Sequence, residues 1–263
     1  MKIGVCTKAK NEEKIISDWV NHYLKLDFDK IIIYDDNSLE PTENTLKRKN
    51  IINDKITILN SNQFSQTDLY KDCIESNKDL DWLLLCDADE FLWIKDKKTI
   101  KQWLELYNND VCSIFINWLT YGTGKRKVYD YSLSVYKQFT VRENYNCFWN
   151  NFTKSFIRPK LIERVSNVHE TYNKKYKIYN VYNKPINLSN NLQYKDKYYS
   201  DNTPVVLIHY MTLDIESMLL KNKKNKDGGL LTKNDFKYSF EWYKDPTFGF
   251  KDSCVDYRMI KYE

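Results

Sequence analysis

The sequence predicts an α/β fold in which a mostly parallel central sheet is flanked by helices. Short β-rich runs alternate with helical patterns over residues 1–90, which is typical of βαβ units. Polar clusters follow several of these runs, where the carboxyl ends of parallel strands would meet. With 42% hydrophobic residues, six glycines and five prolines among 263 residues, the chain is neither collagen-like nor disordered. We therefore expect a compact globular protein.

The elements of the first half follow from periodicity. Each expected strand is a short run rich in Ile, Val, Leu or Tyr, and each expected helix has apolar residues at three- and four-residue spacing. Strands that are connected by helices in this way are usually parallel neighbours. The expected strands are Ile3–Thr7, Lys30–Tyr34, Lys55–Leu59 and Trp82–Cys86, and the expected helices are Glu12–Leu26, Thr42–Lys49 and Thr67–Asn77.

Beyond residue 90 the alternation is less regular. A helix is expected near Thr99–Tyr107 and a strand at Val111–Trp118, followed by mixed aromatic and polar segments. A last strand at Pro204–Tyr210 and a helix at Asp214–Lys224 complete the pattern. The length allows one large domain or two small ones, and no internal repeat or Gly/Ser linker divides the chain.

Charge and cysteine content narrow the possible functions. Lys and Arg number 41 against 36 Asp and Glu, but the lysines are interleaved with acidic residues instead of clustered, so no nucleic-acid partner is expected. The six cysteines form no C-x-x-C pair, which fits a reducing compartment. No apolar run approaches the ~20 residues of a membrane helix. We expect a cytoplasmic protein without a transmembrane segment, in solution or at a membrane surface.

The ends of the expected strands carry the residues suited to chemistry. The first strand is followed by Thr7–Glu12, the second by Asp35–Ser38 and the fourth by Asp87–Glu90. Asp87 and Asp89 form a D-x-D triplet directly after the apolar run WLLLC. Carboxylate oxygens in such a place suit Mn²⁺ or Mg²⁺ bridging a diphosphate. The alternative is an acidic turn that simply ends the strand.

Two histidines are alternative nitrogen ligands for the same ion. His209 stands at the end of the apolar run VVLIHY, and His169 lies in the segment NVHE. His22 falls on or beside the apolar face of the first expected helix, so a structural role is expected for it.

Several segments resemble a known family. KNEEKIISDWVNHYLKLDFDKIIIYDDNS, QTDLYKDCIESNKDLDWLLLCDADEFLWI, TKSFIRP, VHE and IHYMTLDIESMLLKNK resemble, in this order, the glycosyltransferase family 2-like proteins grouped with family 92. The resemblance implies a GT-A fold, Rossmann-like, as in nucleotide-diphospho-sugar transferases. One GT-A domain would fill residues 1–263, with a nucleotide-sugar-binding half at 1–95, an acceptor-binding half at 96–225 and a C-terminal extension at 226–263. Asp27 stands where such sequences have glycine, and Asp tolerates the left-handed backbone of that turn.

The resemblance also implies roles for individual residues. Asp36, Asn37 and Ser38 would contact the base and ribose of a UDP- or GDP-linked sugar, and Lys221 would lie near the diphosphate. Asp87 and Asp89, with Asp89 the direct ligand, and His209 would bind Mn²⁺ or Mg²⁺. The residues implied to line the nucleotide are Thr7, Lys10, Asn11 and Glu12.

The implied reaction is a metal-dependent transfer of a sugar, with inversion, to a glycan, glycolipid or glycoprotein hydroxyl. Glu170 is the first candidate for the base that takes the acceptor proton, and Asp130 is the second. Two alternatives stay open. A strand that ends in D-x-D also begins the haloacid dehalogenase-like phosphohydrolase motif, and a non-catalytic carbohydrate-binding protein could keep the GT-A fold.

Overall fold

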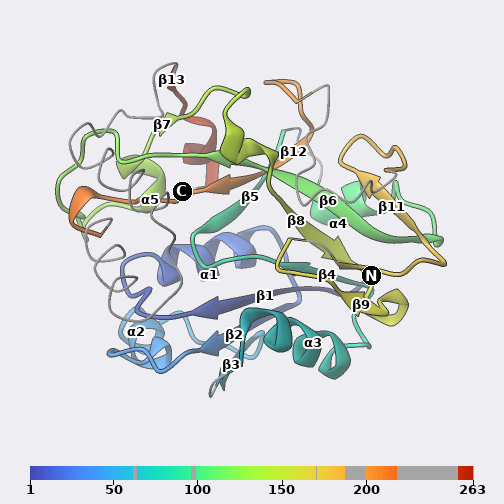
Figure 1. Ribbon diagram of the computed structural model, residues 1–263. Coiled ribbons are helices and arrows are strands. Elements are labelled where there is room, and N and C mark those ends of the chain that lie inside the picture. Colours follow the sequence, from blue (N-terminus) through green and yellow to red (C-terminus); the bar gives the residue numbers. More distant parts are fainter. Residues whose placement is uncertain (62–63, 96–98, 170, 187–198, 218–253, 263) are drawn as a thin grey trace, which may run out of the picture. The chain divides into compact units, whose positions relative to one another are not determined.

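The computed structural model describes residues 1–61, 64–95, 99–169, 171–186, 199–217 and 254–262 (Figure 1). Strands and helices alternate along the first half of this part, as the sequence predicts. The elements are β1 (Ile3–Ala9), α1 (Ile16–Lys25), β2 (Lys30–Asp35), α2 (Thr42–Arg48), β3 (Ile56–Asn60), α3 (Gln66–Ser76), β4 (Trp82–Leu85), β5 (Glu90–Ile94), α4 (Ile100–Leu104), β6 (Val111–Thr120), α5 (Val135–Gln138), β7 (Val141–Arg142), β8 (Thr153–Ile157), β9 (Arg164–Val165), β10 (Thr171–Tyr172), β11 (Lys177–Asn180), β12 (Val205–His209) and β13 (Cys254–Val255).

The predicted α/β fold with a mostly parallel central sheet is confirmed. In the described part of the chain, a nine-stranded sheet has the order β3-β2-β1-β4-β8-β6-β12-β5, and β11 pairs with β6. Strand β1 is parallel to β2 and β4, and β2 is parallel to β3. Strand β8 lies between β4 and β6 and is antiparallel to both. The parallel strands therefore end at one edge of the sheet, and β8 joins this half to β6.

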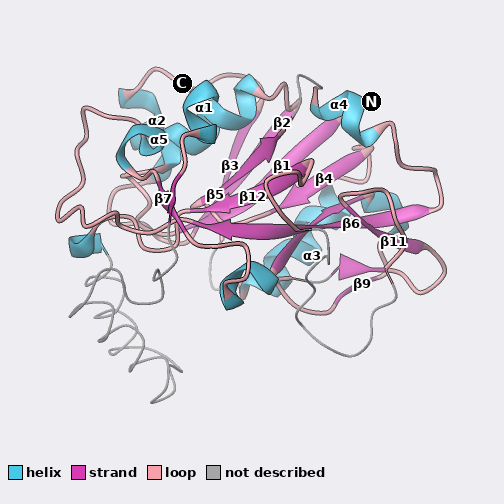
Figure 2. Ribbon diagram, turned by 90° about the horizontal axis from the view of Figure 1, so that it is seen from above, coloured by secondary structure: helices cyan, strands magenta, loops and turns pink. Residues whose placement is uncertain are grey.

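Helices cover both faces of the parallel half, with α1 and α4 on one face and α3 on the other (Figure 2). Because successive side chains of a strand point to opposite faces, Phe156 and Ile157 of β8 are divided between them. Phe156 contacts Phe28, Trp82 and Trp103, with ring centroids 6.0–6.2 Å apart. Burial on both faces explains why these strands are continuous apolar runs.

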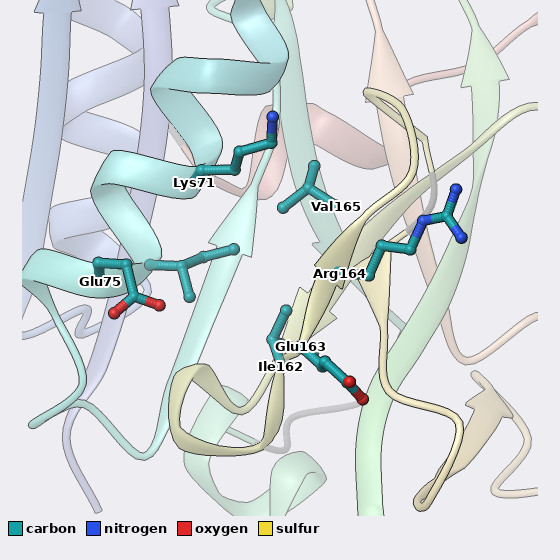
Figure 3. Close-up of a pocket in the computed structure, with 7 residues that line it drawn as sticks. Lys71, Glu75, Ile162, Glu163, Arg164 and Val165 are labelled. Atoms are coloured by element: carbon teal, nitrogen blue, oxygen red, sulfur yellow. The ribbon is translucent and has the colours of Figure 1, made fainter.

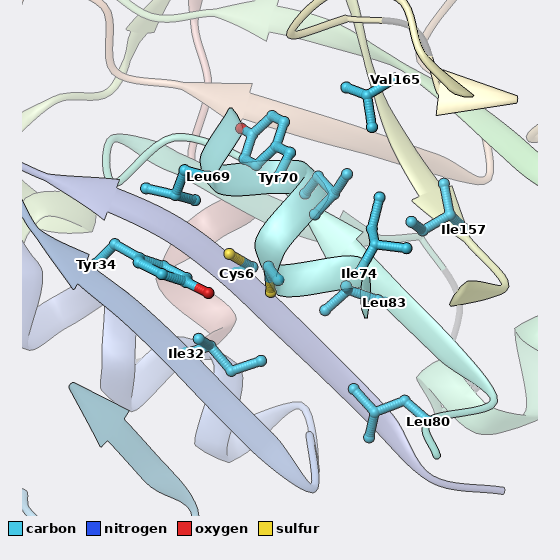
Figure 4. Close-up of a cluster of buried hydrophobic side chains, with 12 residues drawn as sticks. Cys6, Ile32, Tyr34, Leu69, Tyr70, Ile74, Leu80, Leu83, Ile157 and Val165 are labelled. Carbon is cyan, nitrogen blue, oxygen red and sulfur yellow. The ribbon is translucent and has the colours of Figure 1, made fainter. Parts of the chain in front are cut away.

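A cluster of buried hydrophobic side chains, which includes Ile157, lies between α3 and the sheet (Figure 4). Apolar residues of α3 at helical spacing pack against side chains of the strands. Burying each large side chain in this way stabilises the fold by about 1.5–3 kcal/mol. This burial fixes the beginning of α3 against the sheet. The buried members are Cys6, Ile32, Tyr34, Leu69, Tyr70, Cys73, Ile74, Leu80, Leu83, Leu85, Ile157 and Val165.

The chain divides into two compact units. Unit 1 comprises Met1–Trp118 and Asn150–Leu207, and unit 2 comprises Leu119–Trp149 and Ile208–Glu263. Within unit 2, β13 pairs with β7, and the backbone N–H of Tyr121 donates to the carbonyl of His209 at 2.8 Å. None of the helices in the described residues is long and apolar enough to cross a membrane.

Two local features bear on the sequence predictions. Helix α1 begins at Ile16 and not at Glu12, because Asn11 has a left-handed backbone (φ 56°) and residues 13–15 form a turn. Asp27 has φ 61°, which confirms that this residue takes the left-handed conformation where glycine was expected. The expected helix at 214–224 is described only as far as residue 217, where residues 215–217 are helical.

Candidate active site at the carboxyl ends of the strands

The loops after β1 and β2 are tied together by side chains. Asn11 and Asn37 both have left-handed backbones, with φ of 56° and 54°, which Asn tolerates better than most residues. The backbone N–H of Asn11 donates to Ser38 Oγ at 2.9 Å, and the N–H of Leu39 donates to Asn11 Oδ1 at 2.7 Å. The structure therefore brings together Asn11 and Ser38, two residues that the sequence places at separate strand ends.

Asp36 is the centre of a charged cluster beside this loop pair. Its Oδ2 lies 3.2 Å from both Lys8 Nζ and Lys10 Nζ, and Ser61 Oγ donates to its Oδ1 at 3.0 Å. Burial opposes ionisation, but the hydrogen bonds from Ser61, Lys8 and Lys10 outweigh it and lower the pKa of Asp36. Asp36 is thus an anion, and two lysines stand at the point where the resemblance places a nucleotide.

The neighbouring carboxylate, Asp35, has a structural role. It accepts the backbone N–H of Ser38 at 2.8 Å and of Thr42, the first residue of α2, at 2.7 Å. These bonds lower its pKa although burial acts in the opposite direction. Asp35 therefore fixes the loop on which Asp36 stands.

The D-x-D triplet forms a tight turn between β4 and β5. The N–H of Glu90 donates to the carbonyl of Asp87 at 3.1 Å, and the N–H of Asp87 donates to Glu90 Oε2 at 2.8 Å. Glu90 has no solvent exposure, and Asp89 is 8% exposed. Burial raises the pKa of Glu90 well above its ordinary value, although the Lys154 ammonium acts in the opposite direction. The buried Glu90 thus holds the turn in place by accepting the N–H of Asp87.

Lys154 of β8 lies against this turn. Its Nζ is 2.8 Å from Asp87 Oδ2 and 3.8 Å from Glu90 Oε1, and its side chain is 1% exposed. Burial by itself lowers the pKa of Lys154, but the carboxylates of Asp87 and Glu90 outweigh burial and raise the pKa above its ordinary value. Lys154 is therefore a buried cation at neutral pH.

Gln66, the first residue of α3, holds the other oxygen of Asp87. Its Nε2 donates to Asp87 Oδ1 and, at 3.0 Å, to Tyr70 Oη. Helix α3 begins at this point because Ser65 caps it, accepting the N–H of Asp68. Both oxygens of Asp87 are thus engaged by the protein.

The remaining nucleotide candidates differ in exposure. Thr7 is fully buried in β1, Glu12 is half-buried and Asn37 is exposed. Glu12 accepts the N–H groups of Ile15 and Ile16 through its carbonyl, and so shapes the turn before α1. Lys221 lies outside the described residues, and its role stays a prediction.

His169 packs between aromatic rings of unit 1. Its ring centroid lies 5.3 Å from that of Trp118 and 5.2 Å from that of Phe152, and its Nδ1 is 2.9 Å from the carbonyl of Thr153. The carbonyl of His169 lies 3.3 Å from Ser155 Oγ. This segment therefore lines the strand that carries Lys154.

Two further candidates belong to unit 2. His209 ends β12 and is 7% exposed. Asp130 accepts the N–H of Ser132 at 2.9 Å and its Oγ at 2.6 Å, and these bonds lower the pKa of Asp130. Glu170 lies outside the described residues. The choice between Glu170 and Asp130, and between His169 and His209, stays a prediction.

A separate cavity of about 300 Å³ lies between α3 and the segment that leads into β9 (Figure 3). Its rim carries charges of both signs, including Lys71, Glu75 and Arg164. Lys71 pairs with Asp68 at 3.0 Å and Glu75 pairs with Lys78 at 2.6 Å, so both are already neutralised. We assign no ligand to this cavity.

Comparison with protein families decides what kind of protein carries this cluster. The model of glycosyltransferase family 92 matches residues 1–227. The chain belongs to glycosyltransferase family 92. This membership makes the protein a glycosyltransferase and confirms the resemblance seen in the sequence. It also sets aside the phosphohydrolase and the non-catalytic binding protein. A comparison with curated proteins gave no match.

Among solved structures, this family 92 glycosyltransferase is similar to TarS 1–349 from S. aureus. The identity is 17%, the TM-score is 0.43, and the match covers 95% of this chain and 73% of TarS 1–349. It is also similar to glucosyl-3-phosphoglycerate synthase from Mycobacterium tuberculosis in complex with Mn²⁺, UDP and glucosyl-3-phosphoglycerate. That match has 13% identity and a TM-score of 0.35, and it covers 61% of this chain and 57% of the synthase. The family assignment rests on the sequence match over residues 1–227.

In this family 92 glycosyltransferase, sequence reasoning did not single out Gln66 or Lys154, and it named Glu90 only as part of the polar run Asp87–Glu90. Gln66, Glu90 and Lys154 all contact Asp87, yet they come from three different elements. One signal was available, because the two-residue alternation of a strand puts Lys154 of the run TKSFI on the same face as Phe156, where a lysine is unusual. Lys8, which pairs with Asp36, belongs to the polar run Thr7–Glu12, but the sequence predicted no individual role for it.

Proposed function

We propose that this family 92 glycosyltransferase transfers a sugar, with inversion and with the help of Mn²⁺ or Mg²⁺, from a UDP- or GDP-linked donor to a hydroxyl group. The acceptor would be a glycan, a glycolipid or a glycoprotein. The observation that carries the proposal is the Asp87-Ala88-Asp89 turn at the end of β4, fixed by contacts from Gln66, Glu90 and Lys154. A turn so constrained presents carboxylates with little freedom to rearrange.

The residues of this turn fit a divalent cation in donor type. Mg²⁺ and Mn²⁺ prefer oxygen ligands, and Mg²⁺ is usually bound through one or two carboxylates together with substrate phosphates. In the part of the chain that the structure describes, no group of three or more His, Cys, Asp and Glu residues is arranged to hold a metal ion. We propose that Asp89, as the direct ligand, and Asp87 would share the ion with the donor's diphosphate, and that His209 is a further ligand. When bound, the ion would stabilise the charge of the leaving diphosphate.

The chain's own residues would bind and orient the donor. Asp36, with Asn37 and Ser38, is proposed to contact the base and ribose, because the loop that carries them is fixed by Asp35. Lys8 and Lys10, which both pair with Asp36, would add positive charge near the nucleotide. Asn11 and Glu12 are proposed to line the nucleotide, whereas the buried Thr7 would act by supporting the end of β1.

Glu170 remains the first proposed base and Asp130 the second. A general base works best when its pKa lies near the working pH. The hydrogen bonds from Ser132 lower the pKa of Asp130, which makes its carboxylate a weaker proton acceptor. This observation favours Glu170 over Asp130.

Donor binding and donor hydrolysis by an Asp89→Asn variant test the proposal. UDP or GDP with Mn²⁺ should raise the melting temperature of the wild-type protein by mass action. Asp89→Asn should lose this shift and should lower Mn²⁺-dependent hydrolysis of the matching nucleotide sugar by about 10²-fold or more, since the leaving-group charge is no longer offset.

Asp79→Asn is the matched control. Asp79 belongs to another D-x-D triplet, Asp79/Asp81, but it is exposed and precedes β4 instead of following it. This variant should behave as the wild type. Wild-type hydrolysis by Asp89→Asn would overturn the assignment of the turn.

A further inference from the structure

Lys154 occupies a position where a strand normally has an apolar residue. It is the second residue of β8, two residues before Phe156 and therefore on the same face of the strand, and it has no solvent exposure. Placing an ammonium group there costs several kcal/mol unless close anions compensate. The closest carboxyl groups are those of Asp87, at 2.8 Å, and Glu90, at 3.8 Å. The buried cation therefore belongs to the D-x-D turn and not to the general core.

Lys154 contacts the first carboxylate of the D-x-D triplet. It forms a direct ion pair with Asp87, whose second oxygen accepts from Gln66. A divalent cation that bound Asp87 through Oδ2 would have to share that oxygen with an ammonium 2.8 Å away. The Lys154 side chain is 1% exposed and that of Asp87 is 33% exposed, so water screens the repulsion between two cations there only in part. Lys154 thus opposes a metal ion at Asp87.

We propose that Lys154 is a positioning residue and the built-in counter-cation of the D-x-D turn. It holds Asp87 and competes with the divalent cation for that carboxylate. The affinity of the turn for the metal ion therefore stays low until a nucleoside diphosphate is present. The proposal rests on the proposed function, which places the ion and the diphosphate at this turn. The diphosphate brings negative charge and oxygen ligands, and both offset the repulsion from Lys154. Metal ion and nucleotide therefore bind with positive coupling, which is reciprocal by thermodynamic necessity.

The test is the affinity of Lys154→Met for Mn²⁺, followed by the electron paramagnetic resonance signal of free aqueous Mn²⁺. Without nucleotide, the variant should bind Mn²⁺ more tightly than the wild type, on the order of tenfold. The gain in Mn²⁺ affinity on adding UDP or GDP, whichever stabilises the wild type, should shrink correspondingly. A purely structural lysine predicts the opposite, because a loosened turn binds Mn²⁺ less tightly.

Two further variants keep the test decisive. Lys154→Met leaves Asp87 and Glu90 without their buried cation. Lys154→Met/Glu90→Gln therefore also replaces the buried carboxyl group by a neutral amide, and it should likewise bind Mn²⁺ more tightly than the wild type. Lys154→Arg keeps the charge and should restore the weak binding. Circular dichroism confirms that each variant is folded.

Lys101→Met is the matched control. Lys101 pairs with Asp27 at 3.0 Å and Asp29 at 3.3 Å, which form a D-x-D triplet at the turn before β2. Its removal should change neither Mn²⁺ affinity nor the effect of nucleotide. If the wild type binds Mn²⁺ with nucleotide but folded Lys154→Met binds it no more tightly, the role of Lys154 is overturned. If the wild type binds no Mn²⁺ even with nucleotide, the metal dependence of the proposed function fails, and this inference fails with it.

Discussion

Carboxylates at the strand ends differ in role because they differ in partner. Asp35 accepts two backbone N–H groups, the adjacent Asp36 pairs with two lysines, and Asp87 pairs with the buried Lys154. The sequence identifies all three as acidic residues that follow strands. It does not identify their partners, since Lys8 and Lys154 reach them through the fold and not through sequence spacing.

Asp35→Ala tests the structural role at the level of one residue. The N–H groups of Ser38 and Thr42 lose their acceptor, so the free energy of unfolding at pH 7 should fall by about 1–2 kcal/mol, as for the loss of a helix cap. The pKa of Asp35 is lower in the folded protein than the ~3.9 of an unfolded chain. Its stabilisation is therefore fully present above about pH 4 and is lost as the pH falls through the folded pKa.

Urea denaturation of the wild type and of Asp35→Ala from pH 7 down to pH 3 measures this effect. The difference in unfolding free energy should narrow at the acid end. Glu43→Ala is the control, because Glu43 is half-exposed and pairs with Lys47 at 2.7 Å on the surface of α2, so its loss should cost less than about 1 kcal/mol. A difference that stays constant with pH would show that the Asp35 charge is not what stabilises the loop.

At the scale of elements, the pairing of β8 with its neighbouring strands could not be predicted from the sequence. The strands and helices up to β4 were predicted because each has its own local periodicity. The pairing of β8 with β4 and β6 depends on residues far apart in the chain, such as Leu84 opposite Phe156. Local patterns contain no such information. The D-x-D turn was therefore found from the sequence, whereas the cation that β8 supplies to it was not.

Phe156→Ala tests how far β8 is anchored by its aromatic face. The variant removes a fully buried ring that contacts Phe28, Trp82 and Trp103, and should lower the free energy of unfolding by about 3–5 kcal/mol. Ile157→Val, on the opposite face, removes one methyl group and should cost about 0.5–1.5 kcal/mol. Guanidinium denaturation measures the free energy of unfolding of both variants. Equally small decreases in the two variants would contradict the packing of Phe156 against three aromatic rings.

At the scale of the whole molecule, unit 2 extends beyond the part that the family shares. The family match ends at residue 227, yet residues 254–262 belong to unit 2 through the pairing of β13 with β7. Asp256 Oδ2 accepts from Arg142 Nε at 2.5 Å and from Arg258 Nε at 2.8 Å. Burial opposes ionisation, but Arg258 and Arg142 lower the pKa of Asp256. A segment without a recognisable motif thus supplies the carboxylate that joins two arginines.

Asp256→Ala should therefore destabilise unit 2. The side chains of Arg142 and Arg258 are only 8% and 11% exposed, so both charges lose a shared anion, at a cost of about 3–5 kcal/mol. Hydrogen exchange at the backbone of residues 141–145 should become faster. Lys261→Ala, in the same segment but exposed, is the control and should leave exchange there unchanged. Unaltered exchange in Asp256→Ala would contradict the anchoring role.

The position of β8 between β4 and β6 also constrains the order in which the molecule assembles. On the ribosome, β4 and β6 emerge before the strand that joins them, so the edge of β4 stays unpaired until residues 153–157 appear. Unpaired strand edges are sites of aggregation. Lys154 arrives on this same strand, so the acidic turn gains its buried cation in the step that covers the open edge.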